Sequence, residues 1–290
     1  MFYLIATIIL NVLISSIFKL FPKYNINTLQ AIVANYIVCV ITGSFFIGHI
    51  PSLNAAIHAT WLPWSLLMGV GFICIFNLLG YSTRVDGITT TTIANKLSLV
   101  IPALFSVILY KEQVGTGKVI GIILALPAVY LTTRVKGENN KPPNLVLPAL
   151  IFIGGGLLDT LMKYVQTYFL PTNDTQALYT IFCFATAASI GILIVAVLIM
   201  LRKTTIRMRN IVAGVCMGIP NYFSIYYLIR LLESKDFLQS SAAIPVLNIG
   251  IVVASTLTAI LLFKEKTTIL RDIGLGLSIL AILLIAFGDK

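Results

Sequence analysis

Charged residues are scarce in this chain of 290 residues: Asp, Glu, Lys and Arg make up 10% of it, against about 25% in soluble proteins. Hydrophobic residues make up 58%, and the longest polar gap runs only from Arg134 to Asn144. Apolar stretches of about 18 or more residues, each long enough to cross the hydrocarbon core of a bilayer, fill nearly the whole chain. The composition therefore predicts a protein embedded in a lipid bilayer, with no soluble domain.

Enzyme and metal motifs are also missing. The sequence has no HExxH, GxSxG or P-loop, and no CxxC spacing. Its four cysteines all lie inside apolar runs, where we expect them to be buried packing residues. We therefore expect no enzyme, no cofactor and no metal site.

The net charge of +10 would suggest a nucleic-acid partner in a soluble protein. Here most Lys and Arg residues sit in short loops between apolar runs, which is typical of retained cytoplasmic loops. We therefore expect no nucleic-acid partner.

The apolar runs are continuous and do not alternate with a period of two, which indicates helices and not a barrel. The fold class expected is an all-α polytopic membrane protein with ten transmembrane helices, the first of them a span and not a signal peptide. The ten spans are 2–20, 28–48, 61–81, 88–110, 117–134, 145–167, 175–201, 210–230, 237–262 and 270–288. The polar segment 135–144 divides them into two five-helix units, 1–134 and 145–290.

The two units carry the same residues at matching places. Five pairs share one offset of 153 residues: Asn95 with Asn248, Lys111 with Lys264, Glu112 with Glu265, Lys118 with Arg271 and Gly121 with Gly274. A repeat of five spans, an odd number, places its two copies in opposite orientations, which is the inverted-repeat plan of many secondary transporters. We expect Glu112 and Glu265 to have structural roles in the turns that they occupy.

Orientation follows from the cations outside the helix interiors. The loops after odd-numbered spans hold twelve Lys and Arg residues, and the opposite side holds five. The positive-inside rule then places both termini outside.

Lys96 is the strongest candidate for a functional residue, because a charge inside the bilayer is costly. It lies about nine residues, or ~13 Å of helix, from Gly87, which makes snorkelling to the interface difficult. No carboxylate lies three or four residues away, so an internal partner must come from another helix.

Three further charged residues within predicted spans are candidates. Asp159 and Lys163 are one helical turn apart, where a structural salt bridge and a ligand role are equally open. Lys19 lies near the end of its span, and we expect it to snorkel.

Uncharged polar residues within the spans give weaker signals. Asparagines there need hydrogen-bond partners, and the candidates for the site are Asn11, Asn95, Asn221 and Asn248. Tyr222 and Tyr226 share a helix face and offer either contact with a substrate ring or interface anchoring. The Gly117xxxGly121 and Gly214xxxGly218 spacings predict close helix packing.

Three stretches carry a resemblance to a known family: GITTTTIANKLSLVIPALFSVILYKEQVGTGKVIG, LLFKEKTTILRDIG and DTLMKY. Together with the five-plus-five repeat, they resemble the drug/metabolite transporter superfamily in its ten-helix EamA-like form, over both halves of the chain. The resemblance implies transport of amino acids, sugars, nucleotide sugars, phosphorylated metabolites or drugs through a cavity between the halves. It also implies termini in the cytoplasm, against the charge count.

Two local likenesses refine that expectation. DTLMK resembles small multidrug resistance exporters, whose proton-coupling Glu lies eight residues before the lysine. Asn11 and Gly155 occupy the matching positions here, which argues against antiport of cationic drugs at that position. Asn95-Lys96 resembles the Asn-Lys pair that helps to hold the nucleotide in nucleotide-sugar transporters, although there the pair lies in the second half.

The sequence therefore predicts a secondary transporter of a small metabolite bearing a carboxylate or phosphate, with Lys96 as the anchor. The alternatives are a proton-coupled exporter of amino acids or drugs acting through Asp159 and, from another class, a non-transporting scaffold or receptor. The compact loops favour a bacterial inner membrane. Substrate identity, coupling ion, direction of transport and oligomeric state, including a homodimer, are left open.

Overall fold

The chain is almost entirely helical. The computed structural model describes residues 2–48, 51–52, 56–110, 115–133, 145–233 and 240–287, and within them the backbone forms eleven α-helices and no strand. In order they are α1 (Phe2–Leu20), α2 (Thr28–Ile47), α4 (Leu62–Val85), α5 (Ile88–Leu97), α6 (Val100–Tyr110), α7 (Thr116–Thr133), α8 (Val146–Phe169), α9 (Asn173–Met200), α10 (Met208–Glu233), α11 (Ser240–Leu261) and α12 (Ile269–Phe287). Seven segments are long and apolar enough to cross a membrane. A helical membrane protein is thus confirmed, whereas ten spans and an inverted repeat stay predictions.

The prediction of one continuous helix over 88–110 is wrong, because the backbone breaks between α5 and α6. Pro102 has no N–H to donate to the carbonyl of Ser98, and its ring collides with that carbonyl in a regular helix. The Ser98 carbonyl instead accepts a bond of 2.9 Å from the backbone N–H of Ile101, which makes a tighter turn. The break lies within the apolar span Ile88–Phe105, of which 67% is buried, the largest share among the seven candidate spans.

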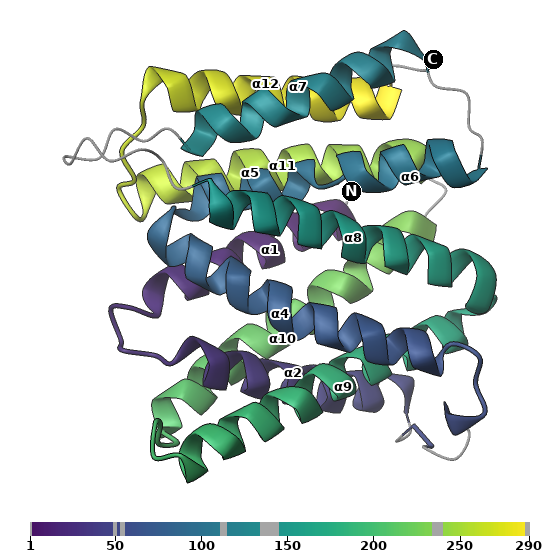
Figure 1. Ribbon diagram of the computed structural model, residues 1–290, viewed down its shortest axis with the longest axis vertical. Helices are drawn as coiled ribbons and strands as arrows, with labels where there is room; N and C mark the ends of the chain where they lie inside the picture. The colour runs from purple at the N-terminus through teal and green to yellow at the C-terminus, as the bar shows by residue number, and fades with distance from the viewer. Residues whose placement is uncertain are drawn as a thin grey trace.

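The helices are arranged in a bundle with two outer groups (Figure 1). Helices α7 and α12 pair at one end of the long axis, and α2 packs against α9 and α10 at the other. Between these groups, α1 contacts α10 and α11, while α8 contacts α4, α5 and α6. Helices α5 and α11 also contact each other, so the broken span lies in the interior of the bundle.

Glycines permit the closest helix contacts, as the small-residue spacings predict. A Cβ atom at Gly214 of α10 would lie 2.5 Å from the Ala31 carbonyl oxygen of α2, and one at Gly218 would lie 2.9 Å from that of Asn35. A Cβ at Gly121 of α7 would likewise lie 2.8 Å from a backbone nitrogen of α12. The α2–α10 and α7–α12 pairs therefore depend on the missing side chains.

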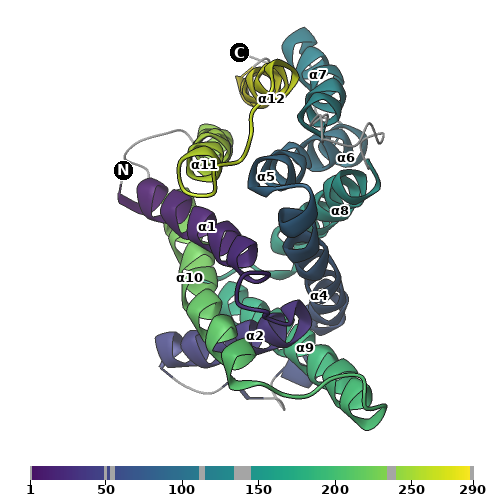
Figure 2. The same ribbon diagram turned by 90° about the vertical axis from the view of Figure 1, so that its left-hand side faces the viewer.

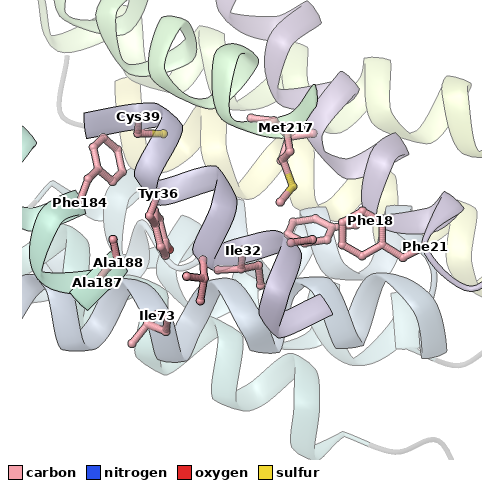
Figure 3. Packing of buried hydrophobic residues seen from close by; sticks show 13 residues of the cluster. Phe18, Phe21, Ile32, Tyr36, Cys39, Ile73, Phe184, Ala187, Ala188 and Met217 are labelled. Carbon is pink, nitrogen blue, oxygen red and sulfur yellow. The ribbon is translucent and has the colours of Figure 1, made fainter. Parts of the chain in front are cut away.

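The largest apolar cluster lies where α2 meets α1, α4, α9 and α10 (Figure 3). Tyr36 is fully buried there, and its hydroxyl donates a hydrogen bond of 2.9 Å to the Phe72 carbonyl. Its ring stacks on Phe184 with a centroid separation of 5.7 Å. This cluster fixes the position of α2 away from the broken span.

The four cysteines are all free thiols. Cys39 and Cys183 are buried, as predicted. For Cys74 and Cys216 the prediction is wrong, because both are exposed on the surface of the bundle. They lie on outward-facing positions of α4 and α10, where an apolar residue of any kind suits a lipid-facing surface.

One end of the bundle is joined by polar contacts between turns, and we call it the turn face. It is formed by residues 21–27, 86–87, 201–207 and 262–268 and faces the viewer in Figure 2. The backbone N–H of Asn27 donates to Asn210 at 3.1 Å, and Gln30 donates to Thr204 at 2.9 Å. These bonds tie the start of α2 to the connection between α9 and α10. Arg84 at the end of α4 donates to Thr28 at 3.1 Å.

Candidate functional site

Charged and polar side chains gather where the broken span meets α8. Lys96 lies in the last turn of α5, and its ammonium group interacts electrostatically with the carboxylate of Asp159 on α8. Among the described residues no ion pair within 4.0 Å joins them. The Ser98 hydroxyl lies 2.5 Å from the Asn95 carbonyl oxygen and 3.5 Å from Asp159 Oδ2. A hydroxyl has a single proton to donate, and the shorter contact is with the Asn95 carbonyl. The Asp159 carboxylate therefore keeps most of its capacity to accept hydrogen bonds from other groups.

The close approach of α8 to the break depends on two glycines. A Cβ at Gly155 would lie 3.1 Å from Asn95 Oδ1 and 3.3 Å from Ser98 Oγ, and one at Gly156 would lie 2.8 Å from the Ser98 carbonyl oxygen. In the part of the chain that is described, the Asn95 side chain forms no hydrogen bond of its own. Its amide is therefore available to a ligand beside Lys96.

Helix α8 runs away from the turn face. Gly154 of α8 faces the Ile75 side chain of α4, and Leu158, one turn later on α8, faces Gly71, one turn earlier on α4. The two helices are therefore antiparallel. Helix α4 ends at the turn face, where Arg84 contacts the start of α2. Successive turns of α8 thus lead from the break toward the opposite end of the bundle (Figure 1).

Exposure along α8 changes at the break. Gly155 and Gly156 are buried against the broken span, whereas Asp159 and Lys163, one turn further along, are exposed. Ser98 on the other side of the contact is fully buried. Asp159 therefore contacts the buried break through Ser98 and is itself exposed, one turn further from the turn face than Gly155.

A second cluster of charges lies at the turn face around Glu265, between α11 and α12. Glu265 Oε1 lies 3.1 Å from Lys19 Nζ of α1, and Oε2 lies 2.7 Å from an Arg271 nitrogen of α12. Oε1 also accepts a bond of 2.9 Å from the backbone N–H of Ile88 at the start of α5. One carboxylate thus joins α1, α5 and α12. The Lys19 ammonium thus lies at the turn face and has a carboxylate partner from the other half of the chain, which the predicted snorkelling did not specify.

Glycine is required where α5 begins, beside this carboxylate. Gly87 has φ of +93°, and a Cβ there would lie 2.8 Å from Glu265 Oε1. Burial alone would raise the pKa of Glu265, but the hydrogen bonds from Arg271 and Ile88 and the charge of Lys19 lower that pKa below its usual value. The carboxylate is therefore held ionised as the N-terminal cap of α5.

The neighbouring Asp86 behaves differently. Burial raises its pKa, and the hydrogen bond from Ser82 together with the charge of Lys19 offsets only part of that effect. The Ser82 hydroxyl donates to Asp86 Oδ2 at 2.7 Å. Of the two acids at the start of α5, Glu265 is the one that carries the ionic contacts.

The remaining predicted asparagines have different surroundings. Asn11 donates to the Thr7 carbonyl of its own helix at 2.9 Å. Asn221 donates to Asn35 Oδ1 of α2 at 3.2 Å, so it contributes to the α2–α10 contact. Asn248 of α11 is buried at 8% exposure, and its side chain has no hydrogen bond within the described ranges. Asn248 is thus the one of these three whose amide is free for a ligand.

The predicted aromatic pair packs against α2. The ring centroid of Phe46 lies 4.5 Å from that of Tyr226 and 6.0 Å from that of Tyr222. The structure does not bring these tyrosines to the Lys96–Asp159 pair. Sequence reasoning also missed Ser98 and the glycine contact at the break, although Pro102, four residues after Ser98, was a usable signal. Among the described residues no group of three or more His, Cys, Asp or Glu could hold a metal ion.

Comparisons with known proteins show the fold but not a family. No family model matches this chain. It is 27% identical over 301 residues to an uncharacterized protein of Haemophilus influenzae, covering 99% of this chain and 98% of that protein. A solved crystal structure superposes with a TM-score of 0.59 at 14% identity, covering 96% of this chain and 95% of the other. At that level of identity the likeness is one of fold alone.

Proposed function

We propose that this protein is a secondary transporter that moves a small anionic metabolite across a membrane, with Lys96 as the anchor. The observation that carries the proposal is the meeting of Lys96 and Asp159 at a helix break within the most buried candidate span. A charge at the centre of a membrane helix costs roughly 2.5–3.5 kcal/mol on insertion scales, so an unneeded pair is expensive to keep. Discontinuous helices at mid-membrane are typical of transporter substrate sites.

The broken span adds backbone groups that suit an anion. The N-terminal end of α6 carries the positive end of its helix dipole and begins at Val100, next to the break. Beside it lie the Lys96 ammonium and the Asn95 amide, and Asn248 of α11 has a free amide one helix away. A carboxylate or phosphate on Lys96 would find donors from these groups.

The pattern of helix contacts supports the inverted repeat. Let α1, α2, α4, α5 with α6, and α7 correspond to α8, α9, α10, α11 and α12. Exchanging each helix for its counterpart then turns the larger observed contacts into observed contacts, whereas smaller ones such as α1–α4 and α2–α4 have no counterpart of that size among the described residues. The α1–α11 contact becomes α8–α5, α2–α10 becomes α9–α4, and α1–α10 becomes α8–α4. The α7–α12, α2–α9 and α5–α11 contacts map onto themselves. This exchange supports two five-helix units and therefore ten spans.

Alternating access gives the Glu265 cluster a role. Lys19, Glu265, Arg271 and the start of α5 hold the turn face together, and Asp159, which lies further from that face along α8, is exposed. The structure thus fits a state that is closed at the turn face, and rocking of the two halves would break these contacts. On the charge count, the turn face is cytoplasmic in a bacterial inner membrane and the protein is open to the outside.

The test is solute counterflow in proteoliposomes, with wild type beside Lys96→Met and Lys23→Met. Lys23 is an exposed lysine at the turn face, so its substitution is the matched control. We expect counterflow of an anionic metabolite with wild type and Lys23→Met and none with Lys96→Met. Equal counterflow by Lys96→Met would refute the anchor.

The other readings give different results in the same assay. Flux of an amino acid or a cationic drug that loses its pH dependence in Asp159→Asn would favour the proton-coupled exporter. If no solute moves and the purified protein retains a soluble partner, a scaffold or receptor is favoured.

A further inference from the structure

We infer that the Lys96–Asp159 pair binds one proton together with each anion, so that the two are carried in the same direction. The inference rests on the proposed function and names its coupling ion. The proton would reside on the Asp159 carboxylate, and the anion on the Lys96 ammonium. The proton comes from the water on the side to which the site is open.

Charge balance in the loaded site favours a proton on Asp159. The empty site holds one ammonium and one carboxylate that act on each other across the α5–α8 contact. An anion arriving at Lys96 takes up the positive charge that had balanced Asp159 and adds a second negative charge next to it. In surroundings of low dielectric two like charges at close range are strongly unfavourable, and one of them takes a proton. Asp159 is the group that can do so, with its acceptor capacity largely unfilled by Ser98 at 3.5 Å.

The groups that act on Asp159 come from α5 and from the break. Among the described residues, Lys96 of α5 and the Ser98 hydroxyl are the groups that act on it. The ionisable residues of α4, which also packs on α8, are Cys74, Tyr81 and Arg84, and none of them acts on Asp159. From Val100 to Phe105, α6 has no ionisable side chain. On α8 itself, Lys163 follows one turn later.

Coupling also requires that water reach the carboxylate. A coupling carboxylate must exchange protons with water when the site is empty, and Asp159 is exposed whereas Ser98 and Gly155 behind it are buried. The Glu265 cluster meanwhile closes the turn face around the start of α5. Coupling requires that the proton reach Asp159 from one side only, and the closed turn face leaves the opposite side for that route.

The sign of proton movement separates the possible substrates. An anion on Lys96 brings a proton with it. A zwitterion would place a carboxylate on Lys96 and an ammonium on Asp159, with no net proton change. A cation on Asp159 would displace a proton. The charged residues beside the break, Lys96 and Lys163 against Asp159, leave a positive excess of one, which favours the anion.

The experiment counts protons taken up on binding by purified protein in detergent. Sulfate and lactate are the anionic probes, because neither titrates between about pH 6 and 8, and glycine and ethylammonium are the zwitterionic and cationic probes. Calorimetric titrations in two buffers with different ionisation enthalpies give the number of protons bound per ligand. We expect one proton per anion for wild type, and a Kd that rises up to tenfold per pH unit where the loaded site titrates.

Three variants locate the proton. Asp159→Asn should bind the anion with no proton uptake and with a Kd that changes less than twofold over the same range. Lys96→Met should bind no anion. Asp272→Asn replaces an exposed acid in the first turn of α12 and should behave as wild type.

The wild-type titration alone can refute the inference, whether or not the variants fold. Anion binding without proton uptake, together with counterflow, would leave the transporter standing and remove the coupling. Proton release on binding ethylammonium, or binding of glycine alone without proton change, would overturn the inference. If neither anion binds and no counterflow occurs, both the inference and the proposed function fail.

Discussion

Glu265→Ala should destabilise the protein strongly, because this carboxylate has three partners from three helices. The substitution leaves Arg271, whose side chain is 5% exposed, without its 2.7 Å partner. It also removes the acceptor of the Ile88 N–H at the start of α5 and the 3.1 Å partner of Lys19. Removing one member of a buried ion pair costs about 3–5 kcal/mol, since the remaining charge stays buried. Lys19 is 23% exposed and can reach water, so its loss adds little to that figure.

A melting curve in detergent measures the effect. With a shift of about 2–4 °C per kcal/mol in a chain of this size, the expected loss in Tm is roughly 6–20 °C. Asp272→Ala is the matched control: this acid is exposed next to Arg271 in sequence, and its loss should change stability by less than about 0.5 kcal/mol. Equal Tm values for wild type and Glu265→Ala would refute the energetic account of the cluster.

The pH dependence of stability provides an independent check. The folded-state pKa of Glu265 is lower than its value of 4.5 in an unperturbed chain. A lowered pKa means that the contribution of the carboxylate is fully present above that value and is lost as the pH falls through the folded pKa. Melting temperatures should therefore fall below about pH 5, and less steeply in Glu265→Gln than in wild type. An equally steep fall in both would assign the acid sensitivity to other groups.

Three further outcomes are expected. Gly274→Ala should destabilise the α7–α12 pair by about 1–3 kcal/mol, because its Cβ would lie 2.9 Å from a backbone nitrogen. A Cβ at Gly276 meets nothing within 4 Å, so Gly276→Ala should raise the stability by about 0.5–1 kcal/mol in the same melting assay. Pro102→Ala should restore the helix hydrogen bond across the break and raise Tm while reducing counterflow; unchanged counterflow would show that the break is not needed. In single-cysteine variants in detergent, a maleimide should label exposed Cys74 and spare buried Cys39 until the protein unfolds; equal rates would contradict the packing of α2.

Much of the helical architecture is predictable from this sequence, because apolar runs of membrane length specify helices whatever their detailed packing. The break within 88–110 is the exception. The hydrophobic run is continuous through Pro102, so a prediction based on hydrophobicity alone does not detect the break. The proline itself nevertheless excludes a regular helix there. Small residues were a reliable guide: Gly214 and Gly218 lie at the α2–α10 contact, where their spacing predicts close packing.

The candidate site is only partly predictable for a geometric reason. Lys96 can be recognised as costly from its position in a span, and the lack of a carboxylate on its own helix requires a partner from elsewhere. Which helix supplies that partner depends on tertiary packing, and the sequence pairs Asp159 with Lys163 equally well. The same limit applies to Lys19 and Glu265, which are far apart in the chain and meet only because α1 and the α11–α12 turn lie at one end of the bundle.

The measurement that tests the central claim most directly is thermal stability in detergent against a panel of anions, zwitterions and cations, with wild type and Lys96→Ala side by side. A ligand that binds the folded state at about 100 times its Kd adds roughly 2.7 kcal/mol to stability and raises Tm. Inorganic phosphate, sulfate or lactate should stabilise wild type and leave Lys96→Ala unchanged. Stabilisation by cations alone, or an equal response of both proteins, would contradict the assignment of the site to Lys96.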